Sequence, residues 1–359
     1  MQAAIIGCGF IAGVHAQALK QLGHKIVTVV DHNLPKAETF AKQWNVQDFA
    51  DDYRQALRDD VDCIHICTPP ATHYQIIKDG LNAGIHVVCE KPMCLDPEKA
   101  LEVYRLSKEK NRIAAVNFNV RFHNACTIAK NVIASTGFGN ICLIHGSYLQ
   151  EFHVLPNAYD WRYNTDLAGP MRATTEIGSH WIDLVRYWTG LEIAEVSANF
   201  GKFSTKRVLV DGIMFSGQKP DGAELTVDSE DAAVISIRFS NGAIGNLLLS
   251  EVSHGRINRL SLEVTSPSHS IWWNSEEPYY LNQSQKSSGV TTQTNAFSGG
   301  FPDTFHTFFS KIYQDIEAGY PAEQPDYPTF FDGYVNAAVC AAIYESANNN
   351  SAWVSITPD

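Results

Sequence analysis

The sequence lacks a basic balance of charge, a long apolar run and a closely spaced pair of cysteines. Lysine and arginine number 27 against 39 aspartates and glutamates, so the formal net charge is −12. An acidic balance argues against a nucleic-acid surface and against a polybasic membrane patch. No apolar run reaches the roughly 18 residues of a membrane-spanning helix. The composition therefore predicts neither a nucleic-acid partner nor a membrane partner.

The amino terminus and the cysteines both favour a cytoplasmic protein. The first residues, MQAAIIGCGF, contain neither a basic region nor a small-residue cleavage site, unlike a secretory signal peptide. The eight cysteines include no CxxC pair, and Cys63 and Cys67 lie four positions apart inside one apolar segment. We therefore expect free thiols in a reducing compartment, with no disulfide framework and no metal site.

The length of 359 residues, with 45% hydrophobic and 18% charged residues, indicates a globular protein of two domains. Up to residue 121, short apolar strands alternate with helices, which predicts a doubly wound parallel sheet. From residue 122 the strand-like segments are longer and richer in β-branched residues, which predicts an antiparallel sheet. We expect an α/β protein with a Rossmann domain over 1–121 and a second α/β domain over 122–359.

Several segments of the second half bear on the site and the core. One helix is expected over about Thr175–Trp188, and two more over Asp303–Ala318 and Phe330–Asn348. The apolar spacing of the helix over Asp303–Ala318 predicts that it buries one stripe of side chains, formed by Phe305, Phe308, Phe309 and Ile312. The polar stretch Asn282–Gly300 has no apolar periodicity, so we expect a loop or lid there.

A glycine-rich turn joins the first strand to the first helix and predicts a dinucleotide site. The turn has the pattern GxGxxA and consists of Gly7, Cys8, Gly9, Phe10, Ile11 and Ala12. Its first glycine permits the tight turn, its second permits close approach of a pyrophosphate, and its small last residue permits helix–strand packing. Asp31 ends the second strand 19 positions after Ala12 and is placed to bind ribose hydroxyls and to repel a 2′-phosphate. The turn and this carboxylate together favour NAD over NADP.

Further polar residues follow the ends of later strands, where ligands bind in parallel sheets. We expect them to border one crevice and to contact the cofactor or substrate; they are Thr68, Pro69, His73, Glu90, Lys91, Asn119 and Arg121. The proline after Lys91 restricts the lysine backbone, which suits a side chain aimed at the nicotinamide.

These motifs together resemble the glucose-fructose oxidoreductase/inositol dehydrogenase (Gfo/Idh/MocA) family. The resemblance covers nearly the whole chain and rests on GxGxxA at 7–12, Thr-Pro-Pro at 68–70, Glu-Lys-Pro at 90–92, Asn-x-Arg-Phe at 119–122 and EIGSHWID at 176–183. It implies a Rossmann domain followed by an α/β domain with a large open, mostly antiparallel sheet. It also implies oxidation or reduction of a sugar, cyclitol or similar polyol carbon with NAD(P), with Lys91 and His180 as catalytic residues.

One position departs from the family pattern. The family usually has aspartate as the first acid of its later motif, whereas this chain has Glu176. The carboxylate is kept but moved by a methylene, so it could contact substrate hydroxyls or His180, or turn away.

The helix spacing places Glu176, His180 and Asp183 on one face, at i, i+4 and i+7. Oxidation of an alcohol requires a group that accepts the hydroxyl proton, and an imidazole can do so near neutral pH. We expect His180 to be the base, Lys91 to stabilise a developing alkoxide, and Asp183 and Glu176 to bind or orient the substrate. The reverse assignment of base and electrostatic partner stays open.

Two residues before this helix are further candidates. Trp161 could stack on a sugar ring, and Arg162 could bind substrate hydroxyls or the nicotinamide end of the cofactor. A packed tryptophan beside a solvated arginine is the alternative.

Two other functions fit the same motifs. The fold also hosts NAD-dependent glycosidases, which oxidise, eliminate and re-reduce their substrate, and non-catalytic NAD- or sugar-sensing regulators. The retention of both Lys91 and His180 favours a dehydrogenase over a sensor.

The second sheet also predicts self-association. We expect one face to be covered by helices and the other to carry apolar side chains, among them Val234, Ile237, Leu247 and Leu249. Burial of that face would form a homodimer or a homotetramer.

Overall fold

The computed structural model describes residues 1–359 except 159–160, 217–220, 296–299, 320 and 357–359. The chain divides into two compact units, the first formed by Met1–Phe122 and Gly299–Ala337, the second by His123–Ser298 and Ala338–Asp359. The first unit therefore also takes a segment that we expected in the second domain.

The first unit is built on a parallel sheet whose strand order is β3-β2-β1-β4-β5-β6. This order, with a crossover between two halves, is that of a dinucleotide-binding Rossmann domain. The strands are β1 (Gln2–Ile6), β2 (Lys25–Val30), β3 (Asp48–Ala50), β4 (Cys63–Ile66), β5 (His86–Cys89) and β6 (Ala114–Val116). The helices are α1 (Phe10–Gln21), α2 (Leu34–Trp44), α3 (His73–Asn82), α4 (Pro97–Glu109) and α8 (Phe301–Ala318), with short 3-10 turns η1 (Tyr53–Ala56), η2 (Pro70–Thr72) and η3 (Asn119–Phe122).

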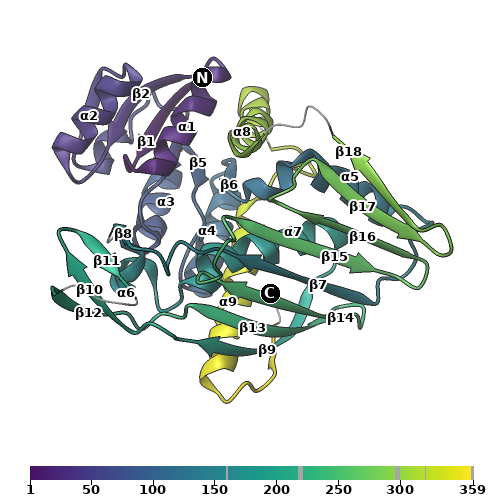
Figure 1. Ribbon diagram of the computed structural model, residues 1–359. Helices are drawn as coiled ribbons and strands as arrows, with labels where there is room; N and C mark the ends of the chain where they lie inside the picture. Colours follow the sequence, from purple (N-terminus) through teal and green to yellow (C-terminus); the bar gives the residue numbers. More distant parts are fainter. Residues whose placement is uncertain (159–160, 217–220, 296–299, 320, 357–359) are drawn as a thin grey trace. The chain divides into compact units, whose positions relative to one another are not determined.

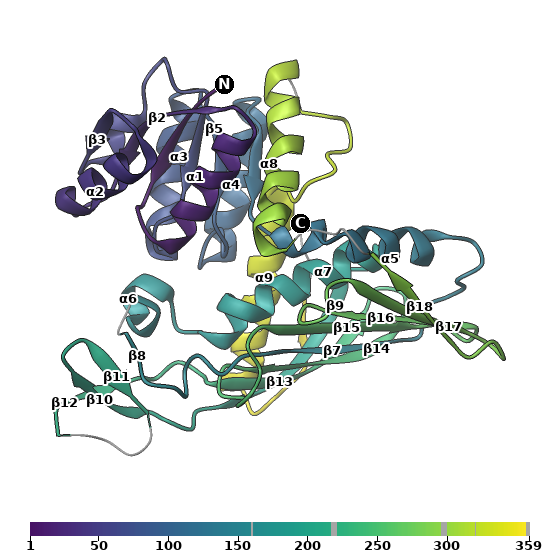
Figure 2. The same ribbon diagram turned by 45° about the horizontal axis from the view of Figure 1, so that its top comes forward.

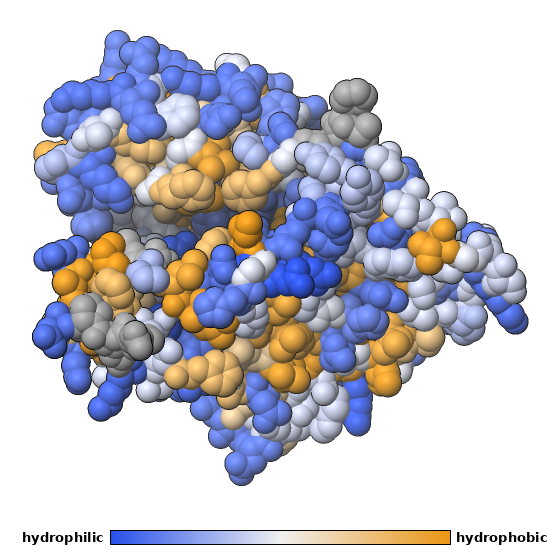
Figure 3. Space-filling model, viewed as in Figure 1, coloured by the Kyte–Doolittle hydropathy of each residue, from blue (hydrophilic) through white to orange (hydrophobic). Residues whose placement is uncertain are grey.

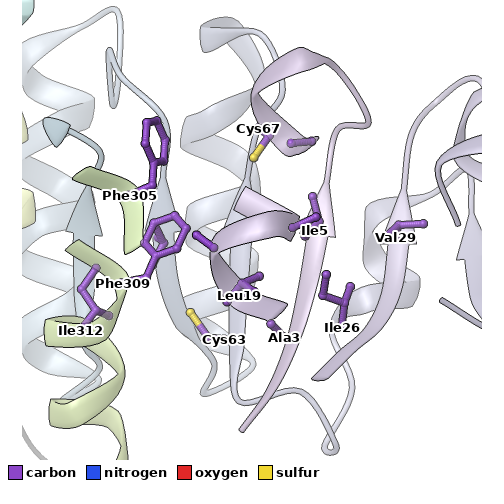
Figure 4. Close-up of a cluster of buried hydrophobic side chains, with 14 of the residues drawn as sticks. Ala3, Ile5, Leu19, Ile26, Val29, Cys63, Cys67, Phe305, Phe309 and Ile312 are labelled. Carbon is purple, nitrogen blue, oxygen red and sulfur yellow. The ribbon is translucent and has the colours of Figure 1, made fainter. Parts of the chain in front are cut away.

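Helix α8 joins the first unit through its apolar stripe. The four residues expected to form that stripe are buried, and three of them, Phe305, Phe309 and Ile312, are drawn in Figure 4 with side chains of α1, β1, β2 and β4. One core cluster contains these residues together with Ala3, Leu19 and Cys63. Burial against α1 and the sheet therefore explains why a segment near the end of the chain packs with its beginning.

The second unit is dominated by a large sheet of order β18-β17-β16-β15-β7-β14-β13-β9-β19, in which β7 and β14 pair in parallel and the other neighbours are antiparallel. The expected mostly antiparallel sheet is thus confirmed. Its strands are β7 (Leu143–Leu149), β9 (Ile193–Gly201), β13 (Ala232–Phe239), β14 (Ile244–Ser250), β15 (Arg259–Thr265), β16 (His269–Asn274), β17 (Tyr280–Gln285), β18 (Val290–Thr294) and β19 (Val354–Ser355).

Helices α5 (Asn124–Ala134) and α7 (Ser179–Thr189) cover one face of this sheet, as Figure 2 shows. Helix α9 (Phe330–Asn348) begins in the first unit and ends in the second. The remaining short elements are α6 (Thr165–Ala168), the 3-10 turn η4 (Trp161–Tyr163) and the π-helical turn η5 (Thr174–Gly178). A small sheet of order β12-β10-β11-β8 adds β8 (Asn157–Ala158), β10 (Lys206–Val210), β11 (Ile213–Phe215) and β12 (Ala223–Thr226).

We expected four apolar residues to share the face of the large sheet that helices leave uncovered, and the strand geometry shows that only one of them does. Ile237, Leu247 and Leu249 are buried, and Val234 alone of the four residues is exposed. Side chains alternate between faces along a strand, so Val234 and Ile237, three positions apart on β13, necessarily point to opposite faces. The residues that share the exposed face with Val234 are Leu248, directly opposite it on β14, and the cross-strand pair Ile244 and Leu143.

The expected loop over 282–300 is also wrong in part. Strands β17 and β18 form an antiparallel hairpin there, and residues 296–299 lie outside the described part of the chain. All five residues of β18 are exposed, so the strand is held by backbone pairing and carries no apolar alternation that a sequence pattern could reveal. Within the described ranges, none of the helices combines the length and apolarity needed to cross a bilayer.

Candidate active site

The glycine turn between β1 and α1 has the geometry of a dinucleotide cradle. Gly7 has a φ of +94°, and a Cβ at this position would lie 2.6 Å from the carbonyl oxygen of Cys67. A Cβ at Gly9 would meet no atom of the protein within 4 Å. Gly7 is therefore required by the fold, whereas the open space at Gly9 is suited to a ligand that approaches the backbone.

The amino terminus of α1 leaves this cradle suited to a phosphate. Gly9 is the N-cap residue and provides no side-chain cap to the first-turn N–H groups. Such N–H groups and the positive end of the helix dipole bind phosphates. Ala12 is buried, Ile11 is half-buried, and Phe10 is 84% exposed at the mouth of the turn. The residues present thus fit the pyrophosphate of a dinucleotide.

Asp31, which directly follows β2, lies against the same turn. Its Oδ2 accepts a hydrogen bond from the backbone N–H of Cys8 at 2.9 Å, and its Oδ1 accepts one from Asn33 at 3.0 Å. Lys36, which the sequence analysis missed, lies 3.1 Å from Oδ2. Burial alone would raise the pKa of Asp31, but these hydrogen bonds and the Lys36 ammonium outweigh it and hold the pKa below its usual value. Asp31 is therefore an anion at the edge of the turn.

Thr68, Pro69 and His73 follow β4, and the structure gives His73 a structural task. Its imidazole is fully buried, with Nε2 2.8 Å from the carbonyl oxygen of Thr68 and Nδ1 3.0 Å from that of Pro92. Both ring nitrogens face backbone carbonyls, so His73 links the chain after β4 to the chain after β5. Its expected contact with the cofactor stays a prediction, and it would have to be made by another atom of the ring.

Glu90 and Lys91 follow β5, and the carboxylate of Glu90 lies in the interior. The imidazole of His15 approaches Glu90 Oε1 at 2.9 Å, the amide of Asn117 donates to the same oxygen, and the backbone N–H of Lys91 donates to Oε2 at 3.3 Å. Lys91 itself is half-buried, and its peptide bond to Pro92 is cis. The structure therefore ties the backbone of Lys91 to a buried carboxylate.

Asn119 and Arg121 lie on η3, after β6, and both have partners near the end of the chain. Asn119 donates to the hydroxyl of Thr304 at 2.8 Å, and Arg121 forms an ion pair with Asp332 at 2.9 Å. Asp332 also accepts from the backbone N–H of Thr329 at 2.8 Å. Sequence reasoning missed Thr304 and Asp332, since neither belongs to a motif and both are distant in the sequence.

In the second unit, Arg162 and Glu176 lie together. Arg162 Nε donates to Glu176 Oε2 at 3.0 Å, and the guanidinium lies 4.6 Å from the centre of the Trp161 ring. Glu176 belongs to the π-helical turn η5, whereas His180 belongs to the regular helix α7. A π-turn has i→i+5 hydrogen bonds and here ends at Gly178, so the expected shared face of Glu176 and His180 stays a prediction. The contact of Glu176 with Arg162 was not among the possibilities left open by the sequence, and its contacts with substrate or His180 stay predictions.

His180 and Asp183 both lie on α7 but differ in environment. His180 is half-buried, with its ring centre 6.3 Å from that of Tyr148 on β7, and Asp183 is buried. The helix is anchored by Trp181, which is fully buried and donates to the carbonyl oxygen of Ser261 at 3.0 Å. Gly146 on β7 is required for this contact, because a Cβ there would lie 2.5 Å from the indole nitrogen.

A buried group of charges that no motif indicated lies just before η5. Arg172, which is fully buried, donates to Glu251 at 2.6 Å and to Asp231 at 2.5 Å. Glu230 accepts from the backbone N–H groups of Arg172 and Thr174 at 3.0 and 2.8 Å. These contacts secure the start of the π-turn that carries Glu176, because a buried charge is stable only when it is paired.

The structure describes all eight cysteines as free thiols, seven of them buried. Among the residues that the structure describes, no group of three histidine, cysteine or acidic side chains could hold a metal ion.

Two family models match the chain. The model described as an oxidoreductase family with an NAD-binding Rossmann fold matches residues 1–118, and the model of the GFO/IDH/MocA C-terminal domain matches residues 127–268. Levoglucosan dehydrogenase of Pseudarthrobacter phenanthrenivorans is 29% identical over 98% of this chain and 97% of its own length. D-glucoside 3-dehydrogenase of Escherichia coli is 27% identical over 68% of each chain.

The fold matches solved structures of the same kind. A levoglucosan dehydrogenase in complex with NADH and L-sorbose superposes with a TM-score of 0.91 at 28% identity, covering 99% of both chains. The matches cover both units and agree with the motifs from which the resemblance was drawn. The chain therefore belongs to the Gfo/Idh/MocA family of oxidoreductases and carries its NAD-binding Rossmann domain.

Proposed function

We propose that this chain is an NAD-dependent dehydrogenase that transfers a hydride between a CH–OH carbon of a sugar, cyclitol or related polyol and the nicotinamide. The observation that carries the proposal is the cradle beside Gly9, with buried, ionised Asp31 at its edge. The resemblance over the full length to a levoglucosan dehydrogenase supports a carbohydrate substrate. Free thiols throughout the chain support a reducing, cytoplasmic location.

The choice of NAD over NADP rests on Asp31. An ionised carboxylate at the end of the second strand accepts hydrogen bonds from ribose hydroxyls and repels a 2′-phosphate. Lys36, 3.1 Å away, offsets part of that repulsion. We expect wild-type protein to prefer NAD, the variant D31S to gain activity with NADP, and D31S/K36A to lose that gain, measured as the ratio of kcat/KM for the two cofactors.

The chemistry is divided between the bound cofactor and the chain. Bound NAD supplies the hydride acceptor for the alcohol carbon. We assign the hydroxyl proton to His180 and stabilisation of the developing alkoxide to the Lys91 ammonium. Asp183 and Arg121 are assigned to substrate hydroxyls, Trp161 to the face of a sugar ring, and Arg162 with Glu176 to orientation. The cofactor is assigned to Gly7, Gly9, Phe10, Ile11, Ala12, Thr68, Pro69, His73, Glu90, Lys91, Asn119 and Arg162.

Formation of NADH by wild-type protein with a panel of sugars, glycosides, inositols and anhydrosugars tests the function. Levoglucosan and D-glucosides belong in the panel because two relatives are named for them. We expect NADH with at least one substrate, and a loss of turnover of at least about 100-fold in K91A and in H180A. Aglycone release without net NADH would indicate a glycosidase, and binding without absorbance change would indicate a sensor.

We also propose that the chain forms a homodimer or homotetramer through the exposed face of the large sheet. Val234 is 54% exposed and Leu248, directly opposite it, 42% exposed. Figure 3, viewed as in Figure 1, shows apolar side chains among polar ones over the area of β13 and β14. Burial against a second copy would remove this apolar area from water.

A further inference from the structure

A chain of buried polar side chains runs through the core of the first unit and ends at Glu90. The hydroxyl of Tyr313 on α8 lies 2.9 Å from His65 Nε2 on β4. His65 Nδ1 lies 3.0 Å from His15 Nδ1 on α1, and His15 Nε2 lies 2.9 Å from Glu90 Oε1. Both histidines are 0% exposed. Polar groups in such a core are retained only if they bond to one another, so the chain acts as one network.

The hydrogen bond at the Glu90 end of this network has a direction. Burial, reinforced by neighbouring His15, lowers the pKa of His65 well below its usual value, so His65 is neutral. A neutral imidazole offers one N–H and one acceptor nitrogen. With Glu90 ionised, its Oε1 can only accept, so His15 donates to it from Nε2. His15 Nδ1 and His65 Nδ1 share one proton, and the hydroxyl of Tyr313 bonds to His65 Nε2.

The charge on Glu90 depends on its neighbours. Burial raises the pKa of Glu90, but the bond from His15, the amide of Asn117 and the Lys91 ammonium outweigh burial, so the pKa lies below its usual value. The other titratable groups facing it are His73, whose pKa burial lowers, and the thiols of Cys67 and Cys89, whose pKa burial raises. These three groups are neutral near pH 7 and leave the anion to be stabilised by its hydrogen-bond donors and Lys91.

We propose that His15 is a positioning residue that keeps Glu90 as an anion beside Lys91, and that His65 and Tyr313 orient His15 for this task. The link between His15 and catalysis rests on the proposed function, because that function makes Lys91 catalytic. A protonated Glu90 would remove an opposite charge from the Lys91 ammonium. It would also weaken the acceptor that holds the Lys91 backbone N–H.

Two substitutions of His15 separate its two contacts. The amide nitrogen of Gln can occupy the place of imidazole Nε2, and that of Asn the place of Nδ1. H15Q should therefore retain a donor to Glu90, whereas H15N should lose it and keep a polar group beside His65. Both variants place a carboxamide group at the same buried position. We therefore expect the two substitutions to affect folding to a similar extent.

Titration of the Glu90 carboxyl tests the proposal and does not require an enzyme assay. The titration is followed by difference infrared spectroscopy, and the carboxyl band is assigned with the variant E90Q. We expect Glu90 to protonate at higher pH in H15N than in wild type or in H15Q. Y313F, which removes only the last hydroxyl, should shift the titration in the same direction by a smaller amount. Identical Glu90 titrations in wild type and H15N would overturn the proposal. If both His15 variants fail to fold, Y313F decides by the same criterion.

The pH profile of the dehydrogenase then tests the link to Lys91. We expect the ratio of kcat/KM at about pH 5.5 to that at about pH 8 to fall at least about threefold in H15N and to stay near the wild-type ratio in H15Q. An equal loss at all pH values would make His15 merely structural and overturn that link. Absence of NADH formation by wild type with every substrate would refute the proposed function but leave the Glu90 titration decisive for His15.

Discussion

Arg162 Nε and Glu176 Oε2 lie 3.0 Å apart, and this ion pair joins the 3-10 turn η4 to the π-turn that precedes the helix of His180. Glutamate at position 176 is one methylene longer than the aspartate usual in the family. The longer side chain reaches a guanidinium that itself lies over the Trp161 ring.

The pair should behave as one unit in catalysis. We expect R162A and E176A each to lower kcat/KM by about 10-fold and the double variant to lower it little further, since residues that act together are not additive. E176D should weaken the pair by shortening its reach. A matched control is K202A, which breaks the exposed Lys202–Asp228 pair of the same unit and should leave kcat/KM unchanged. Fully additive losses would contradict the coupling.

The two glycines of the turn should fail in different ways. G7A forces a side chain into a φ of +94° and against the carbonyl of Cys67, so we expect a loss of about 1–3 kcal/mol in the free energy of unfolding. G9A meets no protein atom within 4 Å, so its unfolding should match wild type. Its methyl group would occupy the approach of the pyrophosphate and should weaken NADH binding at least about 10-fold. Denaturant unfolding measures the stability of each variant, and NADH fluorescence measures its affinity for the cofactor. Wild-type NADH affinity in G9A would refute the assignment of this turn to the pyrophosphate.

Buried His123 should make the fold sensitive to acid. Burial lowers its pKa from 6.5 to about 4, and its ring lies 5.2 Å from that of Trp273. The folded pKa is depressed, so the neutral histidine contributes stability that is present above pH 6.5 and lost as the pH falls toward 4. The contribution is roughly 3 kcal/mol at most.

H123F should therefore lose less free energy of unfolding than wild type between about pH 7 and pH 4. Some acid sensitivity should remain, because burial also lowers the pKa of His86 to about 4 and that of His153 to about 3. H254F, at an exposed position, is the matched control and should follow wild type. Denaturant unfolding at each pH gives the comparison, and an unchanged slope in H123F would rule out this role.

Charges on the outer face of the large sheet should break the proposed assembly. We expect V234E/L248E to reduce the mass measured by light scattering to that of a smaller species, because two carboxylates would be buried at the interface. The circular dichroism spectrum should be retained, since both side chains are exposed on one chain. I257E places the same charge on a side chain that is 67% exposed in a loop and should not alter the mass. A monomeric wild type would refute the proposal directly.

Local patterns in the sequence were sufficient for the Rossmann domain. The glycine turn and the alternation of strands with helices depend on neighbours within a few dozen residues, and they predicted the parallel sheet, the NAD-binding domain and the buried stripe of α8. The family was predicted from short motifs in the same way. The roles assigned to individual site residues stay predictions.

Contacts between distant residues were decided by tertiary structure alone. Arg121 and Asp332 lie 211 positions apart, and His65 and Tyr313 lie 248 apart. No periodicity links such residues, because a buried polar group takes whichever partner the packing of several elements brings within hydrogen-bond distance. The hairpin β17–β18 was also not predicted from the sequence, because its exposed strand β18 carries no apolar alternation. The sequence by itself thus determined the family, the sheet types and the dinucleotide turn. The fold determined which carboxylates are anions and what holds them, because burial and partners set the charge of a side chain.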